Sequence, residues 1–199
     1  MNTMLQVDAQ PLVLREDRPD GLTTLTLNRP GQFNSLSQAM LTALQNELDA
    51  IAADETRRVV VIAGAGKAFC AGHDLKEMRA APSLAYYERL FAQCGRMMMS
   101  LQQLPVPVIA RVQGDVYAGG VGLVSVCDMV VAVEGAGFCL SEAKLGLLPA
   151  TIGPYVVRAL GEQASRRYFI TAERFSAAEA YRLGLVHELA TAESLDDKV

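Results

Sequence analysis

The chain has 199 residues, of which 51% are hydrophobic and 20% are charged, a balance typical of a globular protein with one substantial core. Its net charge of -4 argues against a nucleic-acid partner, and no apolar run reaches the roughly 18 residues of a membrane span. The first 17 residues lack the basic and apolar regions of a secretory signal, which predicts a cytoplasmic protein.

Metal and disulfide chemistry are not expected. With only His73 and His187, the chain has too few ligands for a zinc site. The four cysteines show no CxxC spacing and lie among apolar or small residues, so we expect buried free thiols. They are Cys70, Cys94, Cys127 and Cys139.

The first third of the chain predicts a hairpin, a helix and a buried strand. Residues 12–15 and 23–28 are apolar or alternating around a turn at 18–21, as in a hairpin. Apolar residues then recur at helical spacing over 37–53, with Ser37 available as the N-cap. Residues 58–63 contain an unbroken β-branched run, which indicates a strand covered on both faces.

The middle of the chain predicts a long amphipathic helix over 83–104 and then a strand, a turn and a buried helix within 105–128. The apolar run 106–112 leads through Gly114 to the turn Ala118-Gly119-Gly120, which opens a second apolar run. Free backbone amides at such a helix start can hold negative charge.

The last third predicts strands, a polar break and three helices, followed by an acidic tail. The strands are expected at 129–133 and 137–140, the break at 141–144, and the helices at 155–160, 162–171 and 177–182, the last with Ser176 as N-cap. We assign no structure beyond Glu188, and expect one domain over residues 1–190 with an unstructured acidic tail at 191–199.

Alternating strands and helices predict an α/β fold with a mostly parallel sheet, whose ligands bind at the carboxyl ends of the strands. Two glycine-rich breaks, at 70–73 and 118–120, follow strands and precede helical patterns, so they can meet there. Two converging amides would make an oxyanion hole for a carbonyl that becomes an enolate. Because glycine turns after strands are also common structural features, a purely structural role stays open.

Five segments in order carry a family likeness. They are LNRPGQFNSLS at 27–37, KAFCAGHDLKEM at 67–78, QGDVYAGGVGLVSVCDMVVA at 113–132, SEAKLGLLPATIG at 141–153, and AERFSAAEAYRLGLVHEL near the end. From about Leu12 to Glu188 the chain resembles the enoyl-CoA hydratase/isomerase (crotonase) superfamily. The resemblance implies a crotonase-like spiral of ββα repeats that binds an acyl-CoA thioester, with no cofactor besides the coenzyme A of the substrate. It also implies a homo-oligomer, a trimer or hexamer, and a C-terminal helical segment that is truncated here, leaving apolar surface exposed.

The resemblance assigns the site by position. The oxyanion donors would be the backbone amides of His73 and Gly119, and the imidazole of His73 either lines the pocket or faces solvent. Glu142 would be the acid/base. The implied substrate and CoA contacts are Ala71, His73, Leu75, Lys76, Gly119 and Gly120, with Lys76 pairing with a phosphate, while Asp74 caps the next helix.

The chain departs from the family at one of its two usual glutamates, because the first position is Gly122 and only Glu142 remains. One carboxylate can take a proton from water as it attacks C3 and return it to C2, so a hydratase-type lyase with a single glutamate is our reading. An isomerase or thioesterase of the same fold, or a non-catalytic acyl-CoA binder, is the alternative.

The sequence does not identify the acyl group of the substrate. The segment 138–175 resembles methylglutaconyl-CoA hydratases of branched-chain catabolism, whereas segments before it resemble another enoyl-CoA hydratase-like branch. If the acyl chain ended in a second carboxylate, a basic partner would be needed, and the candidates are Arg79, Lys144 and Arg158.

Overall fold

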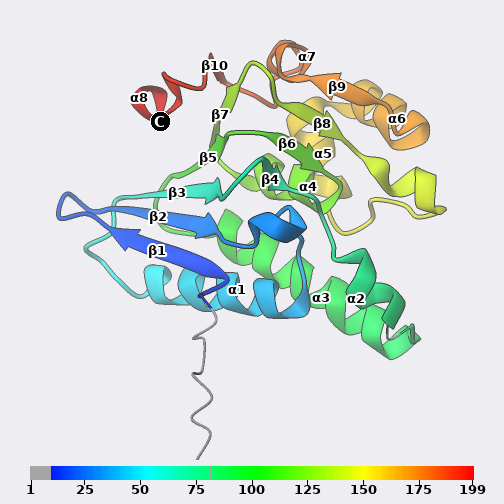
Figure 1. Ribbon diagram of the computed structural model, residues 1–199, viewed down its shortest axis with the longest axis horizontal. Coiled ribbons are helices and arrows are strands. Elements are labelled where there is room, and N and C mark those ends of the chain that lie inside the picture. The colour runs from blue at the N-terminus through cyan, green and yellow to red at the C-terminus, as the bar shows by residue number, and fades with distance from the viewer. Residues whose placement is uncertain (1–9, 81) are drawn as a thin grey trace, which may run out of the picture.

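A six-stranded sheet forms the larger layer of the fold (Figure 1), seen in a computed structural model that describes residues 10–80 and 82–199. In spatial order its strands are β1 (Val13–Asp17), β2 (Leu22–Leu27), β3 (Val59–Gly64), β5 (Val108–Val112), β7 (Met129–Val133) and β10 (Glu188–Ala190). Only the β1–β2 pair is antiparallel, which confirms the predicted hairpin and the mostly parallel sheet. The first nine residues, where we expect no targeting signal, lie outside the described residues.

A second sheet of short strands lies beside the first. In spatial order its strands are β4 (Ala68–Cys70), β6 (Asp115–Tyr117), β8 (Gly137–Cys139) and β9 (Arg174–Ser176). Strands β3, β5 and β7 each lead into one of these strands and then toward a helix, which confirms the crotonase-like spiral of ββα repeats. The sequence did not predict β4, β6 or β9, because three residues are too few to show alternation.

Most of the helices fall where the sequence pattern predicts them, and α8 is the exception. They are α1 (Gln38–Ala52), α2 (Leu75–Ala80), α3 (Leu84–Gln102), α4 (Gly119–Val126), α5 (Gly153–Leu160), α6 (Glu162–Thr171), α7 (Ala177–Arg182) and α8 (Leu195–Lys198), with 3-10 turns η1 (Pro30–Gln32) and η2 (Ser141–Leu145). The hydroxyls of Ser37, Ser83 and Ser176 each accept a backbone N–H bond at a helix start, so the predicted caps of α1 and α7 are confirmed.

The core lies between the larger sheet and the pair α1 and α3, which run side by side along one of its faces (Figure 1). Buried side chains of β3 such as Val60 and Ile62 meet Leu44 of α1 and Met98 of α3 in one cluster. All four cysteines are buried free thiols, as predicted. The burial of Cys70 raises the pKa of its thiol to about 12, so it is not a nucleophile at neutral pH.

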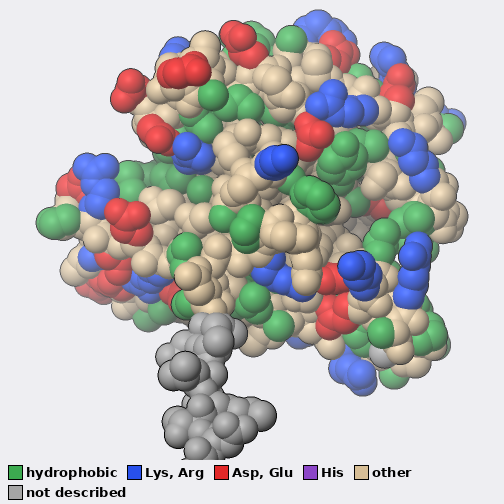
Figure 2. Space-filling view, in the orientation of Figure 1, with side chains coloured by type: hydrophobic (Ala, Val, Ile, Leu, Met, Phe, Trp, Pro, Cys, Tyr) green, Lys and Arg blue, Asp and Glu red, His purple; other side chains and the backbone are tan. Residues whose placement is uncertain are grey.

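The surface mixes charges of both signs. Figure 2 shows Lys and Arg interspersed with Asp and Glu over the face in view, in keeping with the small net charge of -4. Over the described residues, no helix combines the length and the apolar character that crossing a bilayer requires.

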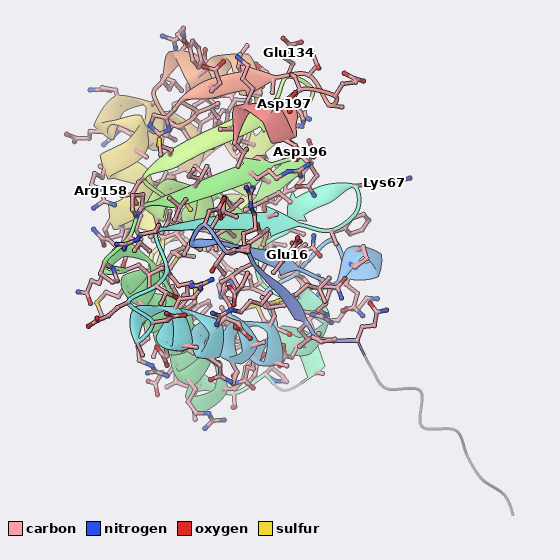
Figure 3. All side chains as sticks on the ribbon, turned by 90° about the vertical axis from the view of Figure 1, so that its left-hand side faces the viewer. Glu16, Lys67, Glu134, Arg158, Asp196 and Asp197 are labelled. Carbon is pink, nitrogen blue, oxygen red and sulfur yellow. The ribbon has the colours of Figure 1, made fainter. Side chains whose placement is uncertain are left out.

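The C-terminal segment corrects one prediction, because the residues after Glu188 are not unstructured. Strand β10 pairs in parallel with β7, and α8 follows it beside the open face of the larger sheet (Figure 3). Leu195 of α8 is 1% exposed and packs in a small cluster with Val61 and Ile109, while Asp196 accepts a 2.6 Å bond from Arg111. One leucine in an acidic segment has no periodicity, so only the fold reveals its role.

The docking of α8 can be tested by Leu195→Ala. The lost contacts and the cavity left behind should lower the free energy of unfolding by about 2–3 kcal/mol. Leu84→Ala is the matched control, because Leu84 is 75% exposed and should change stability by less than about 0.5 kcal/mol. Urea unfolding measures both, and equal midpoints for the two variants would contradict the packing of α8.

Candidate active site

Three neighbouring strands of the smaller sheet deliver the predicted site residues to one place. Strand β6 pairs in parallel with β4 on one side and with β8 on the other, so the carboxyl ends of all three share an edge. His73, Gly119 and Glu142 each follow one of these strands by two or three residues. The edge at the carboxyl ends of parallel strands is where ligands bind in α/β proteins.

The two glycine turns touch through their backbones. A Cβ on Gly72 would lie 2.8 Å from the Cβ of Ala118 and 3.0 Å from the amide nitrogen of Gly119, closer than real side chains allow. Gly72 has a φ of 79°, a conformation that suits glycine. Ala118 has a φ of 46°, which is strained for alanine, and its amide donates a 2.8 Å bond to Cys139. The turn before α4 is thereby fixed to the end of β8.

The amide of His73 is left free by the way its turn is held. The Leu36 amide donates to Gly72, and the Leu36 carbonyl accepts from the amide of Asp74, so the backbone groups on either side of His73 are satisfied. Among the described residues, the amides of His73 and Gly119 donate no hydrogen bond. Two unpaired donors on turns in contact are the elements of an oxyanion hole.

Asp74 caps α2, as predicted. Its carboxylate accepts from the amides of Lys76 and Glu77 and pairs with Arg29 at 3.2 Å. Burial alone would raise the pKa of Asp74, but the bonds from Glu77 and Arg29 outweigh it and lower that pKa. The turn that carries His73 is therefore fixed at both ends.

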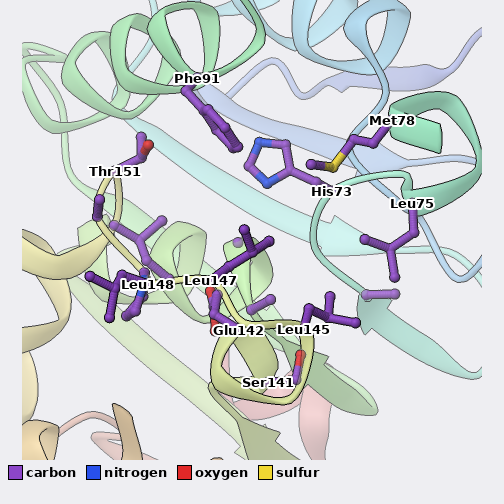
Figure 4. A pocket seen from close by; sticks show the side chains of 16 residues that line it. His73, Leu75, Met78, Phe91, Ser141, Glu142, Leu145, Leu147, Leu148 and Thr151 are labelled. Carbon is purple, nitrogen blue, oxygen red and sulfur yellow. The ribbon is translucent and has the colours of Figure 1, made fainter. Parts of the chain in front are cut away.

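A pocket of about 170 Å³ opens where the strand ends meet. In Figure 4 it lies between His73, Met78 and Phe91 on one side and the loop 141–151 on the other. Most of its wall is apolar, and the polar side chains in it are His73, Ser141, Glu142 and Thr151. An apolar cavity with a few convergent polar groups is what a small-molecule site looks like.

Glu142 contributes a half-buried carboxylate to this wall. It sits in η2, and its Oε2 has no hydrogen-bond partner within the described part of the chain. Burial raises the pKa of Glu142, because the charged form loses its hydration. A carboxyl group whose pKa moves toward neutrality is suited to give and take protons.

The His73 imidazole lines the pocket, which decides between the two orientations the sequence left open. It packs edge to face on Phe91 at 5.4 Å between ring centroids, and its Nε2 is buried without a partner among the described residues. Burial lowers the pKa of His73 to about 4, so the ring is neutral at physiological pH.

Of the other residues predicted to contact the substrate or CoA, two line the pocket and two do not. Ala71 and Leu75 line the pocket, whereas Lys76 is exposed on α2 and does not reach the lining. Gly120 is also outside the lining: a Cβ there would lie 2.5 Å from the carbonyl oxygen of Cys70, so its glycine lets α4 approach β4. The CoA contacts of Lys76 and Gly120 stay predictions.

The loop 145–152 supplies pocket residues that we did not assign from the sequence. Leu145, Leu147 and Leu148 are exposed around the pocket, Leu148 to 80%. The sequence did contain a signal for this part of the pocket, namely three leucines in a loop between a polar turn and a helix. Solvent-exposed loops are usually polar, so a cluster of leucines in a loop indicates a binding surface.

Ile152 fills the space beside Gly122, the position at which the resemblance implies a glutamate in other members of the family. A Cβ on Gly122 would lie 2.2 Å from Cγ2 and 2.6 Å from Cβ of Ile152. Gly122 and Ile152 are both buried, so α4 and the start of α5 pack together through this contact. No side chain fits at residue 122 while Ile152 holds its place, and the pocket contains one carboxylate.

A second, polar cavity lies elsewhere, at the other end of α4. It is about 440 Å³ and its wall includes Asp128, Arg158 and His187. The His187 ring accepts a 3.0 Å bond from the amide of Val130, so it braces β7. Within the described residues, no group of three or more His, Cys, Asp or Glu side chains is placed to hold a metal ion.

The contact between Gly122 and Ile152 predicts a coupled pair of variants. Gly122→Ala should cost about 1–3 kcal/mol of unfolding free energy through overpacking. Ile152→Gly removes the obstructing atoms, so the double variant should be less destabilised than the sum of the two by about 1 kcal/mol or more. Gly135→Ala is the control, because nothing lies within 4 Å of a Cβ there. Additive effects in denaturant unfolding would refute the contact.

A family model described as enoyl-CoA hydratase/isomerase matches residues 17–199. The mitochondrial enoyl-CoA hydratase domain-containing protein 3 of Rattus norvegicus is 32% identical over 191 residues, 96% of this chain and 64% of the relative. An enoyl-CoA hydratase of Alternaria alternata is 34% identical over 177 residues, 85% of this chain and 56% of the relative. The chain thus spans less than two thirds of the length of these curated relatives.

Solved structures give the same likeness in three dimensions. A Mycobacterium smegmatis enoyl-CoA hydratase superposes with a TM-score of 0.93 at 49% identity, covering 95% of this chain and 74% of that one. The structure of the human enoyl-CoA hydratase domain-containing protein 3 gives 0.89 at 32% identity, over 94% and 74%. The family match over most of the sequence and the shared fold together establish that the chain belongs to the enoyl-CoA hydratase/isomerase family.

Proposed function

We propose that the protein is an acyl-CoA hydratase that adds water across the 2,3 double bond of an enoyl-CoA thioester. One observation carries the proposal: a single, mostly apolar pocket is lined by two residues whose backbone amides donate no hydrogen bond within the described chain and by one half-buried glutamate. The amides are those of His73 and Gly119, and the carboxylate is that of Glu142.

The proposed step needs one proton carrier. Glu142 takes a proton from water while the water oxygen bonds to C3, and the electrons of the double bond move to the thioester oxygen as an enolate. The amides of His73 and Gly119 hold that oxygen. Glu142 then returns the proton to C2, so the carboxylate ends as it began.

The surroundings of Glu142 suit this double task. A carboxylate in water is a weak base, and burial makes it stronger by penalising its charge. With its pKa raised, Glu142 accepts a proton more readily at neutral pH, and the protonated form can deliver it to C2. The unpartnered Oε2 leaves an oxygen free for this work.

The acyl group that fits the pocket is apolar and has no terminal carboxylate. In the described part of the chain, the pocket wall contains no Lys or Arg. Arg79 and Lys144 are exposed outside the wall, and Arg158 lines the other cavity. A second carboxylate would therefore be buried without a partner, which is costly. This favours simple 2-enoyl thioesters over methylglutaconyl-CoA.

An isomerase is the second candidate, favoured by the single carboxylate. Moving a proton between C2 and C4 needs one base and no water, and Glu142 meets that need. Supplying 2-enoyl and 3-enoyl thioesters and identifying the products separates the two reactions. A homo-oligomeric assembly and a cytoplasmic location stay predictions, and the rat relative is named as mitochondrial.

Glu142→Gln should lower the turnover of crotonyl-CoA by roughly 10² to 10⁴-fold, the usual contribution of a general acid-base. Affinity for acyl-CoA, measured by calorimetry, should change little because the amide keeps the shape of the side chain. Glu134→Gln is the matched control on an exposed turn (Figure 3) and should leave turnover unchanged. An unaltered rate in the Glu142 variant would remove the proposal.

The wall of the pocket predicts discrimination against dicarboxylates. Crotonyl-CoA should exceed methylglutaconyl-CoA in kcat/KM by about 10²-fold or more, because the latter would bury an unpaired carboxylate. Leu147→Lys places an ammonium group in the wall and should recover part of the dicarboxylate rate. Equal kcat/KM values for the two substrates in the unmodified protein would contradict an apolar acyl group.

A further inference from the structure

The pocket holds a second titratable group whose task the proposed mechanism leaves unassigned. Among the lining residues of the described chain, only His73 and Glu142 have acid-base side chains, an imidazole and a carboxyl group. In the mechanism above, His73 contributes its backbone amide alone. Its imidazole is nevertheless in the wall, facing the cavity from the turn that carries the amide (Figure 4).

The position of Nδ1 is the informative observation. A Cβ built on Gly119 would lie 3.4 Å from Nδ1 of His73, so this nitrogen stands beside the facing turn. One donor amide belongs to the same residue and the other to Gly119. Nδ1 therefore lies on the side of the ring that faces Gly119, the residue that carries the other donor amide.

The ring is fixed in a state suited to donation. Packing against Phe91 at 5.4 Å sets its plane, and the buried Nε2 has no partner in the described residues. The depressed pKa of His73 keeps the ring neutral, with its single proton on either nitrogen. An oxygen that gains negative charge beside Nδ1 selects the tautomer with the proton on Nδ1.

We propose that the His73 imidazole is a third hydrogen-bond donor to the thioester oxygen, acting through Nδ1 beside the amides of His73 and Gly119. The inference rests on the proposed function, because it assigns a donor to the same enolate. No proton is transferred: the Nδ1–H bond shortens toward the oxygen as the enolate forms and relaxes when C2 is protonated. A neutral imidazole polarises a carbonyl without presenting a charge that water would have to solvate in the empty site.

This third donor would stabilise the enolate in a pocket that has a single carboxylate. Within the described residues, Glu142 is the one carboxylate in the pocket wall. The lifetime of the enolate then limits how well one carboxylate can act first as base and then as acid. A third donor lengthens that lifetime, because donors aimed at a developing oxyanion in an apolar site are worth more than in water.

The variants His73→Asn and His73→Gln distinguish the role of Nδ1 from that of Nε2. The side-chain amide of Asn ends close to the position of Nδ1, whereas that of Gln reaches toward Nε2. His73→Leu removes both nitrogens and fills the apolar space between Met78 and Phe91, so folding is preserved. Thermal unfolding of the variants verifies that point, because a leucine there should leave Tm unchanged or higher.

The first readout is the infrared carbonyl stretch of ¹³C-labelled crotonyl-CoA bound to the protein in the Glu142→Gln background, where turnover is suppressed. His73→Leu and His73→Gln should shift the stretch to higher frequency, because the carbonyl is less polarised. His73→Asn should leave it near the parent value. An unchanged stretch in His73→Leu overturns the proposal, since a packing role alone would not polarise the bond.

The second readout uses Glu142 intact. His73→Leu should lower both the hydration of crotonyl-CoA and the exchange of the C2 protons of butyryl-CoA with deuterium oxide, each by roughly 10²-fold, because both pass through the enolate. His73→Asn should retain both within about tenfold. Loss of hydration with exchange intact would mean that His73 holds water, and would also overturn the proposal. If the unmodified protein neither hydrates nor exchanges, the proposed function fails, while the carbonyl stretch still decides the role of His73.

Discussion

The contact between two backbone turns, one after β4 and one after β6, is the constraint on which the site depends. Gly72 has no Cβ to keep the turns apart, so His73 and Gly119 line the same pocket. Ala118 accepts a strained backbone to make this possible, and its bond to Cys139 extends the arrangement to β8. Strain of this kind persists only where the surrounding structure enforces it.

The same strand order brings the carboxylate into place. Because β4, β6 and β8 are neighbours and parallel, segments about 20 to 70 residues apart in sequence end at one edge of the small sheet. Glu142 and His73 then share an apolar enclosure that shifts their pKa values in opposite directions, toward neutral forms of both. An enclosure that disfavours charge at rest strengthens hydrogen bonds to charge that develops during a reaction.

Packing explains why residue 122, where the resemblance led us to expect a glutamate in other members of the family, is glycine here. The side chain of Ile152 occupies the space that a side chain at residue 122 would need, and α4 and α5 are in contact there. The result is a pocket with one carboxylate, an imidazole and leucines at its rim. The chain therefore belongs to the enoyl-CoA hydratase/isomerase family and has its own set of polar side chains in the pocket.

The sequence by itself determined the long helices, the β-branched strands, the serine caps and the family motifs, because each is written in local periodicity or in contiguous residues. It also placed His73, Gly119 and Glu142 in the site, through the order of motifs. Only the tertiary structure decided that the His73 ring faces the pocket, that Ile152 occupies the place opened by Gly122, and that Leu195 docks an acidic tail onto the sheet. These features arise from contacts between residues far apart in the chain, and such contacts leave no repeating pattern in the sequence around any one of them.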